Sequence, residues 1–166
     1  MLTEPSCPLQ PVIRSLAQDD GSAAAEIFFD AVHKGTADVY SPEQREAWAG
    51  LVPNPGAWNK KFKGIHGFAA DIDGSMVGFM TLDATGYIDL AFVRSDLSGR
   101  GIGQLLYDEI EASAVASGIA TLTTEASKKA KPFFIRRGWR IDQEQVVMKN
   151  DVPLTNYKMS KRLDVR

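Results

Sequence analysis

Hydrophobic residues in the first third of the chain recur at helical spacing. After a short strand expected at residues 12–16, the apolar positions between residues 23 and 31 line one face of a predicted helix. Asp19 and Asp20 are its expected N-cap, because a carboxylate can accept hydrogen bonds from the free N–H groups of a first turn. The pair Lys34-Gly35 ends this helix.

A second helix is predicted to begin at Ser41. Ser41 and Gln44 match a capping box, and Pro42 takes the first helical position, where no N–H is needed. This helix is expected to end near Gly50. Residues 53–63 hold two prolines without helical periodicity, and we expect them to form a loop.

The middle of the chain has the pattern of strands. Residues 67–72 and 76–82 flank the pair Asp73-Gly74, which is a strong hairpin signal. Residues 86–93 are apolar at odd and even positions alike, so this strand is expected to be central and covered on both faces. Asp89 is its only charged residue, and we expect it to face a cleft because a buried carboxylate without a partner is costly.

The second half of the chain alternates helices with strands. Together with the earlier elements, this order predicts a mixed α/β fold. The expected elements are a helix from Ile102 to Gly118, a strand at 119–124, a helix at 128–137 capped by Ser127, and a hairpin of strands at 140–148 and 153–161.

Composition and charge exclude several classes of protein. The chain has 166 residues, of which 44% are hydrophobic and 24% charged; this fits a single domain at 12–166 and is too polar for a transmembrane protein. Residues 1–11 carry three prolines and lack the pattern of a secretory signal, so we expect a flexible tail. The formal net charge of −2 gives no general attraction to nucleic acid or acidic membranes.

Cysteine and histidine usage adds little chemistry. The single cysteine, Cys7, cannot form an internal disulfide, which agrees with a reducing compartment and leads us to expect a cytoplasmic protein. The two histidines, His33 and His66, are not set in a cluster of metal-binding residue types, so no metal site is expected.

Three alternate glycines, Gly99, Gly101 and Gly103, separate the apolar strand from the helix that follows it. Glycines at such a turn let backbone N–H groups face outward at a helix N-terminus, whose partial positive charge favours an anion. A phosphate-bearing ligand is therefore the first hypothesis. The patterns of a P-loop and of a dinucleotide-binding fingerprint are both absent.

The string Ser98-Gly99-Arg100-Gly101-Ile102-Gly103 resembles the acetyl-coenzyme A loop of the GNAT superfamily of N-acetyltransferases, whose usual form is Gln/Arg-x-x-Gly-x-Gly/Ala. Ala130, Phe133 and Phe134, with the pair Gly138-Trp139, resemble the family's later motif, Ala-x-x-Phe-Tyr followed by a Gly-aromatic pair. Within the superfamily, residues 33–44 and 152–159 are similar to a bacterial branch of YafP-like proteins.

The resemblance implies the acyl-CoA N-acyltransferase fold, in which helices flank a central mixed, mostly antiparallel sheet, and it implies acetyl-CoA as the cofactor. It places pantetheine along the main chain of residues 91–93 and the pyrophosphate on the glycine loop. The cofactor-binding residues that it implies are Ala91, Phe92, Val93, Ser98, Gly99, Arg100, Gly101, Ile102, Gly103, Gln104, Ser127, Lys131, Phe133 and Phe134.

Two positions depart from the family's pattern. Ser98 stands where glutamine or arginine is usual, which weakens one pyrophosphate contact but leaves the backbone amides in place. Phe134 stands where many members carry a tyrosine that protonates the departing thiolate, so that acid cannot be assumed here.

Asp89, Tyr157 and Tyr40 are the catalytic candidates. Asp89 could bind the acceptor amine or take its proton through water, or it could instead be a structural partner of a buried arginine or of backbone N–H groups. Tyr157 or Tyr40 could protonate the thiolate, but thiols titrate near about pH 8.5, so an acid is not essential. A role in packing or in the substrate pocket is the alternative for both tyrosines.

The acceptor pocket is expected to include His33, Tyr40, Trp48 and Asp89, because aromatic side chains can enclose an apolar substrate or a cation. Core packing for Trp48, and a surface or capping role for His33, are the alternatives.

The sequence thus predicts an enzyme that moves an acetyl group from acetyl-CoA to a primary amine of a small molecule by direct attack in a ternary complex. A non-catalytic acyl-CoA sensor and a peptide or protein amine acetyltransferase are the alternatives. The expected partner is a small-molecule amine, without nucleic acid or membrane, and a homodimer is left open.

Overall fold

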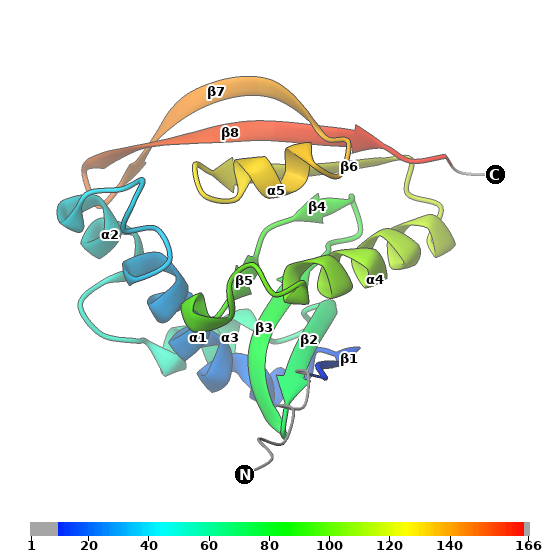
Figure 1. The fold of residues 1–166 in the computed structure, drawn as a ribbon, viewed down its shortest axis with the longest axis horizontal. Coiled ribbons are helices and arrows are strands. Elements are labelled where there is room, and N and C mark those ends of the chain that lie inside the picture. The colour runs from blue at the N-terminus through cyan, green and yellow to red at the C-terminus, as the bar shows by residue number, and fades with distance from the viewer. Residues whose placement is uncertain (1–9, 165–166) are drawn as a thin grey trace, which may run out of the picture.

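Residues 10–164 are described by the structure, a computed structural model of the chain. They form two four-stranded sheets with helices packed on them (Figure 1). In spatial order, the first sheet consists of β1 (Val12–Ser15), β2 (Gly67–Ile72), β3 (Ser75–Thr81) and β5 (Ala91–Val93). The second consists of β4 (Tyr87–Ile88), β6 (Thr121–Ser127), β8 (Val152–Arg162) and β7 (Arg140–Lys149).

Five α-helices and two short 3-10 turns are assigned within residues 10–164. The helices are α1 (Gly21–His33), α2 (Pro42–Ala49), α3 (Pro55–Lys61), α4 (Ile102–Ala116) and α5 (Lys131–Ile135), and the 3-10 turns are η1 (Gln18–Asp20) and η2 (Ser95–Leu97). Every strand pair is antiparallel except β4 with β6. The prediction of a mixed, mostly antiparallel α/β fold is confirmed, with the strands divided between two sheets.

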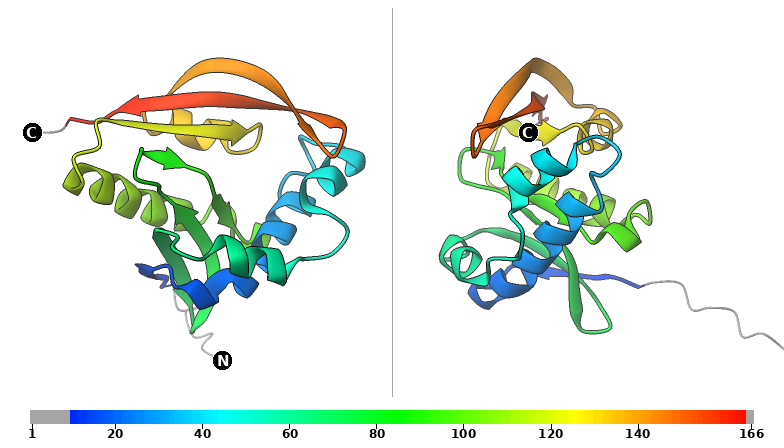
Figure 2. Two further views of the ribbon diagram at one scale, coloured as in Figure 1. Left: turned by 180° about the vertical axis from the view of Figure 1, so that it is seen from behind. Right: turned by 90° about the vertical axis from the view of Figure 1, so that its left-hand side faces the viewer.

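The helices cover both faces of the first sheet. Helix α4 lies on one face and α1 with α3 on the other, as the opposite views of Figures 1 and 2 show. The α4 side buries a cluster that includes Val77, Leu106 and Ile110, while the α1 side buries Phe62 and Phe79. The first sheet is therefore the central layer of the fold.

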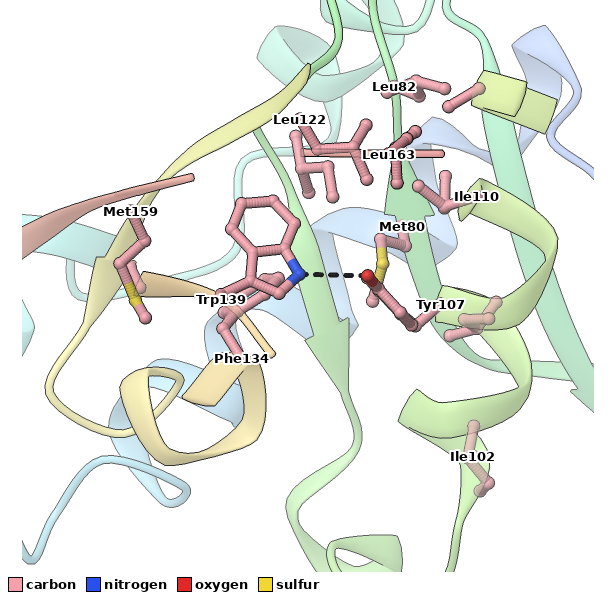
Figure 3. Packing of buried hydrophobic residues seen from close by; sticks show 14 of the residues in the cluster. Met80, Leu82, Ile102, Tyr107, Ile110, Leu122, Phe134, Trp139, Met159 and Leu163 are labelled. Atoms are coloured by element: carbon pink, nitrogen blue, oxygen red, sulfur yellow. Dashed lines mark hydrogen bonds between the residues drawn. The ribbon is translucent and has the colours of Figure 1, made fainter. Parts of the chain in front are cut away.

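The α4 cluster also reaches the start of β7. The indole Nε1 of Trp139 donates a hydrogen bond of 3.0 Å to the Tyr107 hydroxyl (Figure 3), which in turn donates to the Glu111 carboxylate. Burial, followed by the bond to Glu111, raises the pKa of Tyr107 above its usual range. The ring of Phe134 lies 4.8 Å from that of Trp139, so α5 is packed into the same core.

Capping explains which helix predictions were right. The capping box at α2 is confirmed: the Gln44 N–H donates to the Ser41 hydroxyl at 3.1 Å, and the Ser41 N–H donates to the Gln44 side chain at 2.9 Å. At α1 the predicted side-chain cap is wrong. The Asp20 carboxylate turns back to accept from the Ala17 N–H at 2.7 Å and to pair with Arg14.

The loop predicted at residues 53–63 is wrong, since it contains α3. The Asn54 side chain accepts the Ala57 N–H at 3.2 Å, and Pro55 fills the first turn, so the proline that suggested a loop in fact begins a helix. The helix predicted at 128–137 is shorter than expected. It begins only at Lys131. Proline is tolerated in the first turn of a helix but not further inside it, so Pro132 must lie in the first turn.

The strand predicted at 86–93 is not one continuous, doubly covered strand. It divides into β4 and β5, which belong to different sheets, and Asp89 between them is exposed.

The hairpins predicted at Asp73-Gly74 and at Asn150-Asp151 are confirmed. The predicted tail at residues 1–11, including Cys7, lies almost wholly outside the described residues. Among residues 10–164, no helix is both long and apolar enough to cross a membrane.

The Arg14 guanidinium joins the first strand to its neighbours and makes stability depend on pH. It bonds Asp20 at 2.8 Å and Asp71 at 2.7 Å, and the bond to Arg14 holds the pKa of Asp20 below its usual range. A carboxylate with a lowered folded pKa stabilises the fold above the unfolded pKa, near about 3.9, and this contribution is lost as the pH falls through the folded pKa.

We therefore expect Asp20→Asn to lower the free energy of unfolding by about 1.5–3 kcal/mol near neutral pH, the usual range for a hydrogen bond to a charged group. Between about pH 5 and pH 2 the difference from the wild type should shrink, because the wild-type carboxyl becomes protonated. Urea denaturation at several pH values measures this. A difference that does not change with pH would mean that the Asp20 charge plays no part.

Candidate active site at the parting of the two sheets

A β-bulge at Ile88 and Asp89 is the point where the two sheets separate. The Asp83 N–H donates to the Tyr87 carbonyl at 3.0 Å and the Thr81 N–H to the Leu90 carbonyl at 2.9 Å, so two residues, Ile88 and Asp89, stand opposite Leu82 alone. Before the bulge the chain pairs with β6, and after it with β3. The strand therefore leaves one sheet and joins the other at this point.

The split leaves main-chain groups of β5 without a neighbouring strand. The Leu90 carbonyl and the Arg94 N–H both bond to residues of β3. Because bonding direction alternates along a strand, Phe92 also faces β3, whereas the N–H and C=O groups of Ala91 and Val93 face the opposite way, toward β6. Strand β6 pairs with β4 at Thr123 and Thr124 only, so this edge of β5 is open to a ligand.

The glycine loop forms the N-terminus of α4. Gly99 and Gly101 have φ values of 78° and 84°, a left-handed conformation that glycine adopts without strain. Gly101 is the N-cap, and no side chain caps the helix. The first N–H groups of α4 are therefore free, and an added Cβ at either glycine would meet no neighbouring atom within 4 Å. This exposed helix N-terminus has the geometry and charge to hold an anion.

A crevice of about 170 Å³ runs along the open edge of β5. Its walls come from the C-terminal part of α1, from α2, β3 and β5, from the loop before α4, and from the β6–α5 turn. The predicted site residues that line it are Ala91, Phe92, Val93, Ser98, Gly103, Ser127, Phe133, Phe134 and Trp48. The crevice thus connects the glycine loop with an apolar end near α1 and α2.

The remaining predicted cofactor residues lie around this crevice without lining it. Gly99, Arg100, Gly101 and Gln104 are exposed on the loop and the first turn of α4, and Ile102 is buried beneath them. The Lys131 ammonium lies 4.3 Å from the centre of the Tyr157 ring.

Close packing joins the glycine loop to α5. A Cβ added at Gly103 would lie 3.0 Å from a ring atom of Phe133, so glycine permits the approach of the two helices. The Arg137 guanidinium lies 3.5 Å from the centre of the same ring and donates to the Phe133 carbonyl at 2.9 Å and to the Gln104 side chain. The contact of Arg137 with Gln104 was not predicted, because nothing in the sequence pairs the two residues.

Asp89 lies outside the crevice. Its carboxylate is 53% exposed, 3.8 Å from the Lys61 ammonium, and it lines a separate pocket of about 870 Å³ that also includes Tyr87. Burial, with the nearby carboxylates of Glu125 and Asp89, raises the pKa of Tyr87 to about 12. The structure therefore does not bring Asp89 together with the other predicted pocket residues, and Lys61 is a partner that the sequence did not indicate.

The two candidate tyrosines differ in how their hydroxyls are used. The Tyr40 hydroxyl donates to the Thr155 carbonyl at 2.6 Å and accepts the Lys128 N–H at 3.0 Å. Burial also raises the pKa of Tyr40, which makes it a poorer acid. Tyr157 is 8% exposed, and within residues 10–164 no hydrogen bond to its hydroxyl is found. Within residues 10–164 the Tyr40 hydroxyl is thus engaged twice and that of Tyr157 is not, and neither tyrosine lines the crevice.

Trp48 and His33 have different surroundings. Trp48 lines the crevice, with its ring 5.8 Å from Tyr40 and 6.2 Å from Phe92. The His33 ring shares a hydrogen bond of 2.7 Å with the Gly50 carbonyl, which fixes the end of α1 to the end of α2. The placement of His33 matches its alternative, capping role, and only Trp48 borders the crevice.

The comparisons with known proteins agree with this geometry. Residues 36–161 match the family model of the acetyltransferase (GNAT) domain. The chain is 31% identical, over 89% of its length and 93% of the relative, to the uncharacterized N-acetyltransferase YafP of Escherichia coli. It is 26% identical, over 78% of its length and 83% of the relative, to the peptidyl-lysine N-acetyltransferase YjaB of Salmonella typhimurium.

Solved structures show the same fold. A GCN5-related N-acetyltransferase from Rhodopseudomonas palustris has a TM-score of 0.86 and 35% identity, covering 93% of this chain and 98% of that one. The PaiA N-acetyltransferase of Thermoplasma acidophilum, crystallised with coenzyme A, has a TM-score of 0.76 and 17% identity, covering 93% of this chain and all (100%) of that one. This chain therefore belongs to the GNAT family of acetyltransferases, as its sequence and its fold both show, and its open strand edge beside a glycine-capped helix agrees with this.

Proposed function

We propose that the enzyme transfers an acetyl group from acetyl-CoA to a primary amine of a small molecule, which attacks directly while both ligands are bound. The observation that carries this proposal is the open edge of β5, where the main-chain groups of Ala91 and Val93 face a crevice that begins at the free N–H groups of α4.

The residues present fit acetyl-CoA. A pyrophosphate matches the uncapped N-terminus of α4, where Gly99 and Gly101 leave open space beside the backbone. A pantetheine arm, which carries amide groups, matches the unpaired N–H and C=O groups of Ala91 and Val93. We infer that the Ala91 N–H, nearest the bulge, donates to the thioester carbonyl oxygen and stabilises the negative charge that develops there.

Acetyl-CoA supplies an activated acyl group: the amine nitrogen bonds to the thioester carbon, the carbon–sulfur bond breaks, and the proton lost by the amine ends on the thiolate sulfur. Holding both reactants in one crevice raises the rate, because the reaction becomes effectively unimolecular. Asp89 is separated from the crevice, so we propose that it acts on the incoming amine from the neighbouring pocket, through water.

A small acceptor is favoured by the limited volume of the crevice, about 170 Å³, whose lining includes Trp48, Phe92 and Thr36. An aromatic wall of this kind suits an apolar amine. The alternative acceptor is a peptide lysine, which the name of the relative YjaB makes the second candidate. A cytoplasmic location forms part of the same proposal.

The test is to follow thiol release from acetyl-CoA with arylalkylamines, aminoglycosides and lysine peptides, while calorimetry measures coenzyme A binding. Turnover restricted to small amines supports the proposal, and turnover restricted to peptides replaces it with the alternative. Tight binding without turnover on any acceptor would identify a sensor instead.

We propose that Tyr157 protonates the thiolate. Tyr157→Phe is expected to lower kcat roughly 100-fold, the lower end of the range for general acid catalysis, without weakening coenzyme A binding. Tyr40→Phe is the comparison: it should lower stability, because the Tyr40 hydroxyl joins Thr155 and Lys128, and should change kcat less. An unchanged kcat in Tyr157→Phe would assign the proton to water.

A further inference from the structure

Two buried threonines hold the backbone on either side of the bulge. Thr81 on β3 is 4% exposed, and Thr124 on β6 is 6% exposed. The Thr124 hydroxyl donates to the Ile88 carbonyl at 2.7 Å, and the Leu90 N–H donates to the Thr81 hydroxyl oxygen at 3.1 Å. The peptide groups before and after Asp89 are thus each fixed by a side chain.

The side chains add to the backbone pairing of this stretch. A bulge inserts an extra residue and interrupts the ladder, and the Leu90 N–H next to it donates to a side chain in place of a ladder carbonyl. The two hydroxyls come from different sheets, since Thr81 belongs to the first and Thr124 to the second. Each sheet therefore holds one side of the bulge at the point where the chain passes from one sheet to the other.

We propose that Thr81 and Thr124 are positioning residues for acetyl transfer. By fixing the peptide groups at Ile88 and Leu90, they set the direction of the next free donor along the strand, the Ala91 N–H. This proposal rests on the role given to that N–H under the proposed function. Neither threonine touches the reacting atoms, and both act through the backbone.

Their removal should affect chemistry more than binding. Coenzyme A affinity depends mainly on the α4 N-terminus and on Val93, which lie beyond the bulge, whereas the thioester carbonyl depends on the orientation of Ala91. Thr124→Val keeps the shape and the branching at Cβ but removes the hydroxyl that donates to the Ile88 carbonyl. A small misalignment of a reacting group lowers rates by up to about 100-fold.

The experiment measures the carbonyl stretching frequency of carbon-13-labelled acetyl-CoA bound to the wild type, Thr124→Val and Thr81→Val, together with Kd and kcat. Thr123→Val is the matched control, because Thr123 is the exposed neighbour of Thr124 on the same strand. We expect a lowered frequency in the wild type and in Thr123→Val, and a frequency closer to that of free acetyl-CoA in the other two variants. Their kcat should fall at least about 10-fold, with Kd within about threefold of the wild type.

The infrared measurement needs no acceptor, so it separates two kinds of failure. An unshifted carbonyl in the wild type would refute the donor role of the Ala91 N–H, and hence part of the proposed function. A shifted carbonyl that is equally shifted in Thr124→Val and Thr81→Val would refute the positioning role alone. Thr124→Ser retains the hydroxyl and should restore the wild-type frequency and kcat; if it does not, the effect of valine was one of packing. Should one valine variant fail to fold, the other still decides the question.

Discussion

Replacing Gly101 by valine is expected to abolish useful coenzyme A binding, raising Kd by roughly 100-fold or more, which corresponds to about 2.7 kcal/mol. Gly101 has a φ of 84°, where a branched side chain is strained, and it is the N-cap of α4. Relief of that strain would move the first N–H groups of the helix. In addition, the valine side chain would occupy the open space beside the backbone that the pyrophosphate needs. Calorimetric titration with coenzyme A measures the loss.

Gly118→Val provides a matched control for this variant. Gly118 follows the other end of α4, has a φ of 74°, and likewise offers open space, with no atom within 4 Å of an added Cβ. Both substitutions therefore introduce the same kind of backbone strain, but only Gly101 lies at the anion-binding end. Equal losses of coenzyme A affinity in the two variants would mean that general destabilisation, and not the loop itself, is responsible.

Phe134→Ala is expected to destabilise the fold by about 3–5 kcal/mol, the usual cost of removing a buried phenylalanine side chain. The ring is 2% exposed and packs edge-on against Trp139 at 4.8 Å (Figure 3). It also packs edge-on against Phe133 at 5.3 Å. Because Phe134 also lines the crevice, the variant should bind coenzyme A more weakly even where it remains folded. Urea denaturation and calorimetry measure the two effects.

Ile135→Ala tests whether this cost depends on burial. Ile135 is the next residue on α5 and is 46% exposed, so its truncation should change the free energy of unfolding by no more than about 1 kcal/mol. A loss of similar size in both variants would show that α5 itself, and not the Phe134 ring, is the sensitive feature.

Local signals in the sequence were sufficient wherever the interacting residues are close along the chain. The capping box at Ser41 and Gln44, the hairpin at Asp73-Gly74 and the glycine loop before α4 all appear in the structure as predicted. Each rests on backbone preferences or hydrogen bonds within a few residues. The same local reasoning failed at Pro55, because proline both interrupts helices and begins them.

The composition of the strand at 86–93 could not reveal its division. Its apolar residues are compatible with one buried strand. The bulge arises because Tyr87 bonds to Asp83 while Leu90 bonds to Thr81, which leaves Leu82 opposite two residues. The hydroxyls that stabilise the bulge come from Thr81 and Thr124, and the latter lies 36 residues beyond Ile88 along the chain. No short-range pattern encodes such pairings.

What the sequence determined by itself is the family, the mixed α/β class and the glycine-capped helix N-terminus, because these depend on local conformation and on the order of elements. What only the tertiary structure decided is which polar groups are free to act. It separated Asp89 from the crevice, engaged the Tyr40 hydroxyl with Thr155, and left the Ala91 N–H open. A polar group is available for chemistry only where no distant segment satisfies it, and that depends on long-range packing.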